Sequence, residues 1–506
     1  MRHHRRGEIV TPTVSIRRWT RFEDVAGILA ELLNDLYGGR PPVAPGATIV
    51  IKPNITANAP SSSGGTTHVE LVEALVERAK GWHPGRLVVA EGTAAYGATH
   101  ASAFPAGGWR EMAERQGVEL YNLEAGEHRL VPLGRPRYPH PLPISRLVLE
   151  ADLYISVPLL KTHISADYTV ALKNSFALTP QVNRTEIHRQ YLLEEALADI
   201  NRIRPADLVV VDGWDGAEGI AGGTDFRRPA GARTMLAGND PVAVDVMSRQ
   251  LMGLNQRTRY LQWAIDDGVG CGDLARIACL GEEPAGLCHP FMTPGDELRL
   301  IMPGLTLCDG DACSGCRVAV LSSLRRARPP RLLRPLTAVY GEYEGPISSG
   351  GTVLAVGQCA AEHAGLGEYV PGCPPDAEAV HRALRRMGCL CDLCHAPALA
   401  ALEALPAADL ADLRVTAAGD TVFVGPDADP TRRHRVLVVG ACSESYARTV
   451  LDRAPSLGMD PERDVAFVAG CPPAAEEIRR ALVCLLSGSG HGPGTERETA
   501  NPQGEA

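Results

Sequence analysis

The stretch ADLYISVPLLKTH, residues 151–163, decides the fold class. It is a continuous run of apolar residues that ends in Lys, Thr and His. Similar runs occur at ATIVIKPN (47–54), GRLVVAEG (85–92) and ADLVVVDG (206–213). Strands without polar alternation are buried on both faces, as in a parallel sheet. The sequence therefore predicts an α/β N-terminal domain with a mainly parallel sheet, covering residues 1–300.

Helical patterns lie between these runs. VELVEALVERAKGW, residues 69–82, has apolar residues at helical spacing. At its start, Thr67 is followed three residues later by Glu70, which is the spacing of a capping box and predicts a helix start there. A change of composition at 290–305 predicts a domain boundary, and the tail at 486–506 has a disordered composition.

Each predicted strand ends in polar residues: Lys52-Pro53-Asn54, Glu91-Gly92, Lys161-Thr162-His163 and Asp212-Gly213. The carboxyl ends of parallel strands lie at one edge of the sheet, where α/β proteins bind ligands. Charged residues also end strands simply because the chain reaches solvent there. Taken together, the four ends predict a site.

Lysine usage strengthens that prediction. The chain has 50 basic residues, of which only Lys52, Lys80, Lys161 and Lys173 are lysines. A lysine retained among so many arginines suggests a position where a compact charge with an adjustable pKa is needed. Lys80 lies on the predicted helix and looks incidental. The alternative is that the other three form structural ion pairs with Asp212, Asp240 or Asp245.

The site prediction can be stated residue by residue. The lysines would bind a carboxylate or phosphate or donate a proton, and the nearby histidines could share that role. The candidate catalytic residues are Lys52, Lys161, His163, Lys173 and His188, and the candidate substrate-binding residues are Asn54, Thr162, Asn174, Asp212 and Asp240.

Bulk composition limits the function classes. A net charge of -10 argues against non-specific nucleic-acid binding, which needs a basic face. No apolar run approaches the roughly 18–20 residues of a membrane span, and the basic N-terminus has no apolar signal region. We therefore expect a cytoplasmic protein with no nucleic-acid or membrane partner.

All 14 cysteines lie between Cys271 and Cys484, and from residue 306 onward two segments look like copies of each other. Each segment reads CxxC, a helix, a strand ending in GxC, a strand ending in GCPP, and a helix. This order predicts two tandem small α/β modules, residues 306–388 and 389–485. Their candidate metal ligands are Cys313, Cys316, Cys359 and Cys373 in the first module and Cys391, Cys394, Cys442 and Cys471 in the second.

In a reducing compartment, such a cysteine block indicates metal ligation more than disulfides. Four thiolates per module suit a [4Fe–4S] cluster, which makes two [4Fe–4S] clusters in the chain. Zinc also accepts four thiolates, although its sites usually use two CxxC knuckles. A third interpretation adds Cys308 to Cys313 and Cys316 in the spacing of a plant-type [2Fe–2S] site.

Residues about 47–270 carry VIKPN, VPLLKTH, ALKNSF, His188, VVDGWDGAEG and NDPVAVD. As a set these motifs resemble the iron–sulfur protein family catalogued as domain of unknown function 362. The usual C-x2-C-x2-C-x3-C-P run of its fused ferredoxin-like domains is absent here. The second half resembles, more loosely, the cluster module of nickel–iron hydrogenase small subunits, through Cys313-Ser314-Gly315-Cys316, Cys359 and Gly372-Cys373-Pro374-Pro375. That resemblance does not imply hydrogenase activity.

These observations predict an iron–sulfur oxidoreductase. Its clusters would receive electrons from a ferredoxin or flavodoxin and pass them to a small anionic substrate held by the lysines. Two other hypotheses remain open at this point: an electron-transfer or assembly subunit with no chemistry of its own, and a non-redox enzyme with structural clusters.

Overall fold

The structure is a computed structural model of the 506-residue chain. It describes residues 11–487 except 56–59, 93–102, 105–106, 223–228, 256–257, 328–331, 348–350, 391–397, 399–400, 403–404, 407–409, 412, 418–419, 425–434, 441–446, 449, 452–453, 455–458 and 470–472. Most of the predicted tail at 486–506 therefore lies outside the described residues.

An eight-stranded sheet forms the N-terminal part, in the order β12-β1-β11-β10-β7-β2-β3-β4. Its strands are β12 (Ala278–Gly281), β1 (Thr13–Arg18), β11 (Thr234–Gly238), β10 (Leu208–Gly213), β7 (Leu153–Val157), β2 (Thr48–Pro53), β3 (Arg86–Glu91) and β4 (Glu119–Asn122). The run from β10 to β4 is parallel, whereas β11 is antiparallel to both β10 and β1. The expected α/β class with a large, mainly parallel sheet is confirmed.

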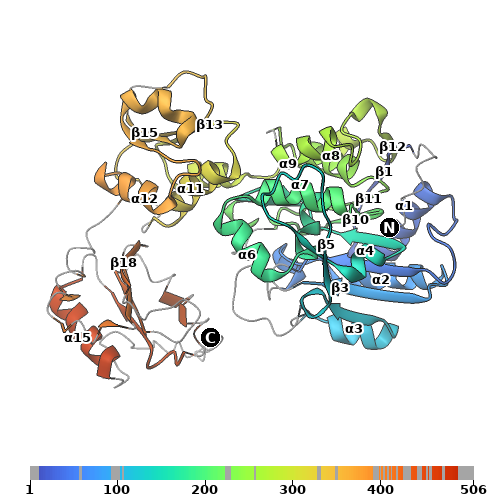
Figure 1. Cartoon of the computed structure of the whole chain (residues 1–506), viewed down its shortest axis with the longest axis horizontal. Helices are drawn as coiled ribbons and strands as arrows, with labels where there is room; N and C mark the ends of the chain where they lie inside the picture. Colours follow the sequence, from blue (N-terminus) through green and yellow to red (C-terminus); the bar gives the residue numbers. More distant parts are fainter. Residues whose placement is uncertain are drawn as a thin grey trace, which may run out of the picture.

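Helices cover both faces of this sheet (Figure 1). One face packs against α1 (Val25–Tyr37), α2 (Val69–Lys80) and α3 (Trp109–Gln116). The other packs against α4 (Arg146–Glu150), α5 (Ala171–Asn174), α6 (Gln181–Arg189), α7 (Leu193–Ile203), α8 (Pro241–Leu251) and α9 (Arg259–Asp266). Side chains alternate between the two cores, since Ile49 and Ile51 face one and Val50 the other. Burying each such side chain stabilises the fold by about 1.5–3 kcal/mol, which explains the lack of polar alternation.

The expected strand at 151–163 is shorter than predicted. β7 ends at Val157, and Pro158 cannot donate a ladder hydrogen bond. The chain turns over the end of β10 and forms a separate hairpin of β8 (Lys161–His163) and β9 (Asp167–Thr169). Lys161 thus lies beside the edge of the sheet and not in it. A second small hairpin joins β5 (His128–Leu130) and β6 (Pro143–Ser145).

The helix expected at 69–82 is α2, but the predicted capping box is wrong. His68 occupies the N-cap and makes no side-chain cap bond. The Thr67 hydroxyl instead accepts from the Asn54 N–H and donates to the Val157 carbonyl, both at 2.9 Å. Thr67 joins the loop after β2 to the end of β7, so it is not available to the helix.

Two further four-stranded sheets follow helix α10 (Pro294–Ile301). The second sheet is parallel, in the order β13 (Leu305–Gly310), β14 (Leu336–Gly341), β15 (Thr352–Val356) and β16 (Glu368–Val370), with α11 (Ser314–Arg325) and α12 (Ala377–Arg386). The third contains β18 (Asp420–Val424), β17 (Leu413–Ala417), β19 (Arg435–Val439) and β20 (Val465–Val468), followed by α15 (Ala475–Ser487). In both, three neighbouring parallel strands are followed in the chain by a helix, although the antiparallel β18 comes between β17 and β19 in sequence.

No helix within the described ranges combines the length and the apolar character needed to cross a membrane.

Candidate functional site

A buried ion pair lies at the carboxyl end of the large sheet. Lys52 on β2 and Glu91 at the end of β3 are 1% and 2% exposed, with the ammonium 2.9 Å from a carboxylate oxygen. The ammonium also donates to the Pro53 carbonyl and to Asn174 Oδ1, each at 3.0 Å. Glu91 accepts further bonds from the Ile55 and Gly92 N–H groups. Burial lowers the pKa of Lys52, and Glu91 opposes that shift.

Two asparagines connect this pair to a second buried lysine. Lys161 donates to Asn54 Oδ1 at 3.0 Å, and Asn54 Nδ2 donates to Asn174 Oδ1 at 3.3 Å. Asn174 Nδ2 donates to the Lys52 carbonyl and to Ser156 Oγ. Both amide oxygens therefore face ammonium groups. The hydrogen-bonded chain Lys52–Asn174–Asn54–Lys161 holds the two lysines at fixed positions.

Lys173 on α5 joins the same charge cluster. Burial, Lys52 and Arg184 together lower its pKa to about 8. Among the described residues it has no hydrogen-bond or ion-pair partner. Burial and the nearby Lys173 charge also lower the pKa of Lys161 well below its ordinary value.

Two histidines adjoin this lysine and stay neutral near pH 7. Burial and Lys173 lower the pKa of His163 well below its ordinary value and that of His188 to about 3. The His163 Nδ1 atom accepts from the Ser165 N–H at 3.0 Å, so in the neutral ring the proton is on Nε2. His188, on α6, packs edge-on against Phe176. We call Lys52, Lys161, His163, Lys173, Arg184 and His188 the basic cluster.

Asp245 on α8 positions the short helix that carries Lys173 and Asn174. Its carboxylate accepts from the Ala171 N–H at 2.7 Å and from the Tyr168 hydroxyl at 3.1 Å. Burial raises the pKa of Asp245 to about 7. The carboxylate therefore satisfies donors at the start of α5 and forms no ion pair with a lysine.

The other candidate residues lie elsewhere. Asp212, at the end of β10, accepts from the His68 backbone N–H and from His68 Nδ1, both at 2.8 Å. The Thr162 backbone N–H and hydroxyl donate to the Ala217 and Gly219 carbonyls, which anchors β8. Asp240 caps α8 and accepts from the Cys271 N–H. It lies at the opposite edge of the sheet because β11 runs antiparallel to β10.

The alternative of structural pairing with Asp212, Asp240 or Asp245 therefore does not describe these lysines. The carboxylate that neutralises Lys52 is Glu91, a strand-end residue noted in the sequence. Arg184, whose partner is Glu124, was not predicted as a member of the site. No local pattern marks one functional arginine in an arginine-rich chain.

The four cysteines of the first predicted module follow strands of the second sheet. Cys313 and Cys316 follow β13 and begin α11, Cys359 follows β15, and Cys373 follows β16. Their thiols interact electrostatically with one another. A hydrogen bond with Cys316 lowers the pKa of Cys313 to about 5, which favours the thiolate. Gly357 has a φ of +90°, and a Cβ there would lie 2.5 Å from the Cys316 sulfur.

A thiolate at Cys313 is the form of cysteine that can ligate a metal. Within the described ranges, no group of three or more His, Cys, Asp or Glu side chains is placed to hold a metal ion. Cys308 packs with Val339 and Val353 in a separate apolar cluster, away from the core that includes Cys316. That placement gives no support to the ligand set built on Cys308. The second set, Cys391, Cys394, Cys442 and Cys471, lies outside the described residues.

The cysteine loops contact the elements that carry the basic cluster. Arg317, next to Cys316, binds Asp167 at 2.7 Å and Asp309 at 3.0 Å. Asp167 pairs with His163 across the β8–β9 hairpin. The Ser314 N–H donates to Glu194 at the start of α7, and its hydroxyl donates to the Tyr191 carbonyl just after α6. The β8–β9 hairpin, which carries His163, therefore contacts α11. The residues just after α6, the helix that carries His188, contact α11 as well.

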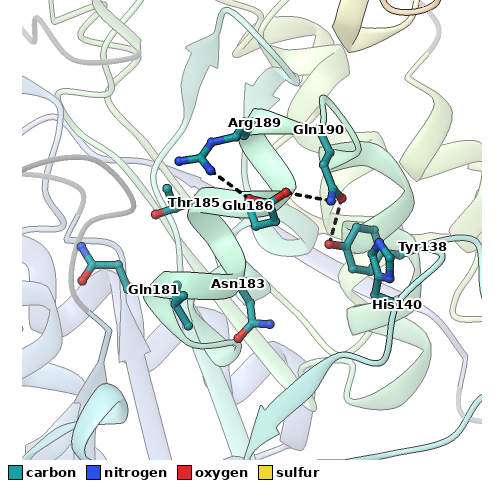
Figure 2. A pocket seen from close by; sticks show the side chains of 9 residues that line it. Tyr138, His140, Gln181, Asn183, Thr185, Glu186, Arg189 and Gln190 are labelled. Atoms are coloured by element: carbon teal, nitrogen blue, oxygen red, sulfur yellow. Dashed lines mark hydrogen bonds and ion pairs between the residues drawn. The ribbon is translucent and has the colours of Figure 1, made fainter. Parts of the chain in front are cut away.

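A surface pocket of about 580 Å³ lies along α6 (Figure 2). Tyr138 and His140 line it from one side, and residues of α6 together with Gln190, just after that helix, line the other. Gln190 links Glu186 to the Tyr138 hydroxyl. Neither Arg184 nor His188 lines this pocket, so it is distinct from the basic cluster.

Residues 49–249 match the family described as Domain of unknown function (DUF362). That range includes every member of the basic cluster. No curated protein matches the chain.

Two solved structures show distant likeness. The lactate racemase apoprotein from Thermoanaerobacterium thermosaccharolyticum is 10% identical, over 74% of this chain and 90% of that one, with a TM-score of 0.28. A protein from Thermotoga maritima is 13% identical, over 38% and 50%, with a TM-score of 0.23.

Proposed function

We propose that the chain is an iron–sulfur oxidoreductase that acts on a small anionic substrate bound at the basic cluster. One [4Fe–4S] cluster would be held by Cys313, Cys316, Cys359 and Cys373. A second would be held by the corresponding cysteines of the repeat, Cys391, Cys394, Cys442 and Cys471. Reduced ferredoxin or flavodoxin would be the electron donor.

The observation that carries this proposal is the ion pair that joins the hairpin carrying Lys161 and His163 to the helix carrying Cys316. The β8–β9 hairpin holds Lys161 and His163 on one strand and Asp167 on the other, and Asp167 binds Arg317 beside Cys316. A structural cluster would need no such link to a group of buried cations. The contact supports electron transfer from the cysteine loops to a substrate at the basic cluster.

Bound clusters would supply electrons one at a time. Side chains of this chain would neutralise the substrate charge, supply the proton and hold the lysines in position. Lys161 and Lys173, in their protonated forms, would neutralise negative charge on the substrate. Neutral His163 would donate a hydrogen bond from its Nε2–H to the substrate, and protonated Lys173, with a pKa of about 8, would supply the proton. The asparagine chain would keep Lys161 in place as the substrate changes charge.

The first test is iron and acid-labile sulfide per chain on anaerobically purified protein. Two clusters predict about eight of each, with electron paramagnetic resonance signals after dithionite reduction. Cys373→Ser is expected to lower both contents to about four, whereas the exposed Cys279 gives the matched control Cys279→Ser with no change. Zinc in place of iron, with no sulfide, would overturn the proposal.

A second test addresses the electron donor. Reduced flavodoxin or ferredoxin should bleach the visible absorbance of the clusters in wild-type protein and in Lys173→Met alike. Substrate turnover should fail only in Lys173→Met. If neither flavodoxin nor ferredoxin reduces the clusters of the wild-type protein or of Lys173→Met, the proposed donor is refuted.

A further inference from the structure

A buried hydroxyl without a hydrogen bond lies on the β8–β9 hairpin. Thr169, at the end of β9, is 1% exposed, and its Oγ1 atom has no hydrogen-bond partner within the described residues. The hydroxyls of three residues nearby in sequence are all hydrogen-bonded, those of Thr162, Tyr168 and Ser175. A polar group that is buried without a partner destabilises the fold, so the environment of the Thr169 hydroxyl needs an explanation.

The hairpin register sets this hydroxyl beside two members of the basic cluster. Thr169 lies directly opposite Lys161, and His163 lies two residues further along the same strand as Lys161. Residues directly opposite each other, and residues two apart on one strand, point to the same face of a hairpin. Thr169, Lys161 and His163 therefore share one face, whereas Thr162 and Tyr168 belong to the other.

The groups on and next to this face are hydrogen-bond donors. The Nδ1 atom of His163 accepts from the Ser165 N–H, and its Nε2–H has no partner in the described part of the chain. Lys173, on the short helix α5 that directly follows β9 and packs against it, has no described partner either. The Asn54 side-chain oxygen already accepts from Lys161. A set of unused donors suits a ligand that carries acceptors, such as an oxyanion.

We propose that Thr169 is a substrate-binding residue of the basic cluster, whose hydroxyl donates a hydrogen bond to an oxygen of the anion. This inference rests on the proposed function in taking the basic cluster as the anion site. His163 and Lys173 are half-buried and contact the outer side of the anion, and the buried Thr169 contacts its inner side. A carboxylate, a sulfate-like or a phosphate-like group can accept this bond. Because the hydroxyl is neutral, the contact does not depend on the protonation state of the lysines.

The experiment is isothermal titration calorimetry of the full chain with sulfate and oxalate, at constant pH and equal ionic strength. Thr169→Val replaces the hydroxyl by a methyl group of similar size. It should weaken binding about 10- to 100-fold, the equivalent of one lost hydrogen bond to a charged group. Thr169→Ser keeps the hydroxyl and should bind both anions as the wild-type protein does.

Urea unfolding without added anion separates a binding role from a structural one. Thr169→Val removes a hydroxyl that has no partner in the described chain, so the unfolding midpoint should stay the same or rise. Thr416→Val is the matched control. Thr416, on β17 of the third sheet, is also buried with an unpartnered hydroxyl in the described part of the structure. That variant should likewise keep its stability, and it should leave the anion affinity unchanged.

Two results would overturn this inference. The first is a folded Thr169→Val that binds both anions as tightly as the wild-type protein. The second is a Thr169→Val that unfolds at a lower urea concentration or fails to fold, because the hydroxyl would then be bonded within the protein.

Lys173→Met separates this inference from the proposed function. Anion binding that is lost in Lys173→Met and kept in Thr169→Val refutes the inference and leaves the proposed anion site standing. Wild-type protein that binds neither sulfate nor oxalate refutes the inference together with that anion site. Iron and acid-labile sulfide, measured on the same sample, then decide the iron–sulfur part of the proposed function separately.

Discussion

Replacing Glu91 by Gln removes the carboxylate of the buried pair and leaves the Lys52 ammonium among neutral oxygens. Breaking a buried pair in this way costs about 3–5 kcal/mol of unfolding free energy. The loss of unfolding free energy also has a ceiling, because Lys52 can lose its proton and become neutral in the folded state. From an ordinary lysine pKa of about 10.4 down to pH 7, at about 1.4 kcal/mol per unit, that ceiling is about 5 kcal/mol.

The pH dependence follows from the same ceiling. In Glu91→Gln the pKa of Lys52 is lower in the folded than in the unfolded state. Stability therefore falls as pH decreases and recovers as pH rises toward the unfolded pKa. At pH 9 deprotonation costs only about 2 kcal/mol, so the penalty of the substitution should shrink to about that value.

The assay is urea unfolding followed by tryptophan fluorescence. All five tryptophans lie between Trp19 and Trp263, so the signal reports the large sheet. Glu119→Gln is the matched control, since Glu119 pairs with Arg86 where the two side chains are 43% and 46% exposed. It should cost about 1 kcal/mol or less.

A double variant completes the test. Lys52→Met with Glu91→Gln removes both charges and should restore most of the lost stability. The reasoning is refuted if Glu91→Gln costs no more than Glu119→Gln, or if its penalty is the same at pH 7 and pH 9.

Three further predictions follow from the described contacts. Arg317→Leu leaves Asp167 buried without its cation and should cost about 3 kcal/mol in urea unfolding; Arg299→Leu, at an exposed pair, should cost about 1 kcal/mol or less. The folded-state pKa of Asp245, about 7, lies above its unfolded value, so its contribution to stability falls from about pH 4 to pH 7 and then levels off; Asp245→Asn should flatten that part of the pH–stability curve. His188, with a pKa of about 3, should show no imidazole titration between pH 5 and 8 by NMR, assigned by loss of the signal in His188→Asn.

The sequence predicted much of the fold because its signals are local. Continuous apolar runs matched β2, β3 and β10 to within two residues at each end, and the helical spacing matched α2. Burial on both faces requires apolar residues at every position, and that requirement is visible in the sequence alone. The capping box was predicted incorrectly because Thr67 bonds to Asn54 and Val157, which lie far from it in sequence.

The candidate site was only partly predictable. The lysine bias pointed to Lys52, Lys161 and Lys173, and the structure brings all three into one electrostatic cluster. Arg184 gave no signal because arginine is the ordinary cation of this chain. Asp240 was predicted to bind substrate, but it follows β11, which runs antiparallel to β10 and ends at the opposite edge of the sheet.

The sequence by itself determined the α/β class, the positions of the buried strands and helices, and the residue types at the strand ends. Only the tertiary structure decided which charges face one another. It pairs Lys52 with Glu91, bridges Lys52 to Lys161 through Asn174 and Asn54, and sets the β8–β9 hairpin against α11. The physical reason is that hydrophobic periodicity specifies which side of an element is buried. The neighbours of a buried charge depend on strand order and direction, which join residues more than 100 positions apart.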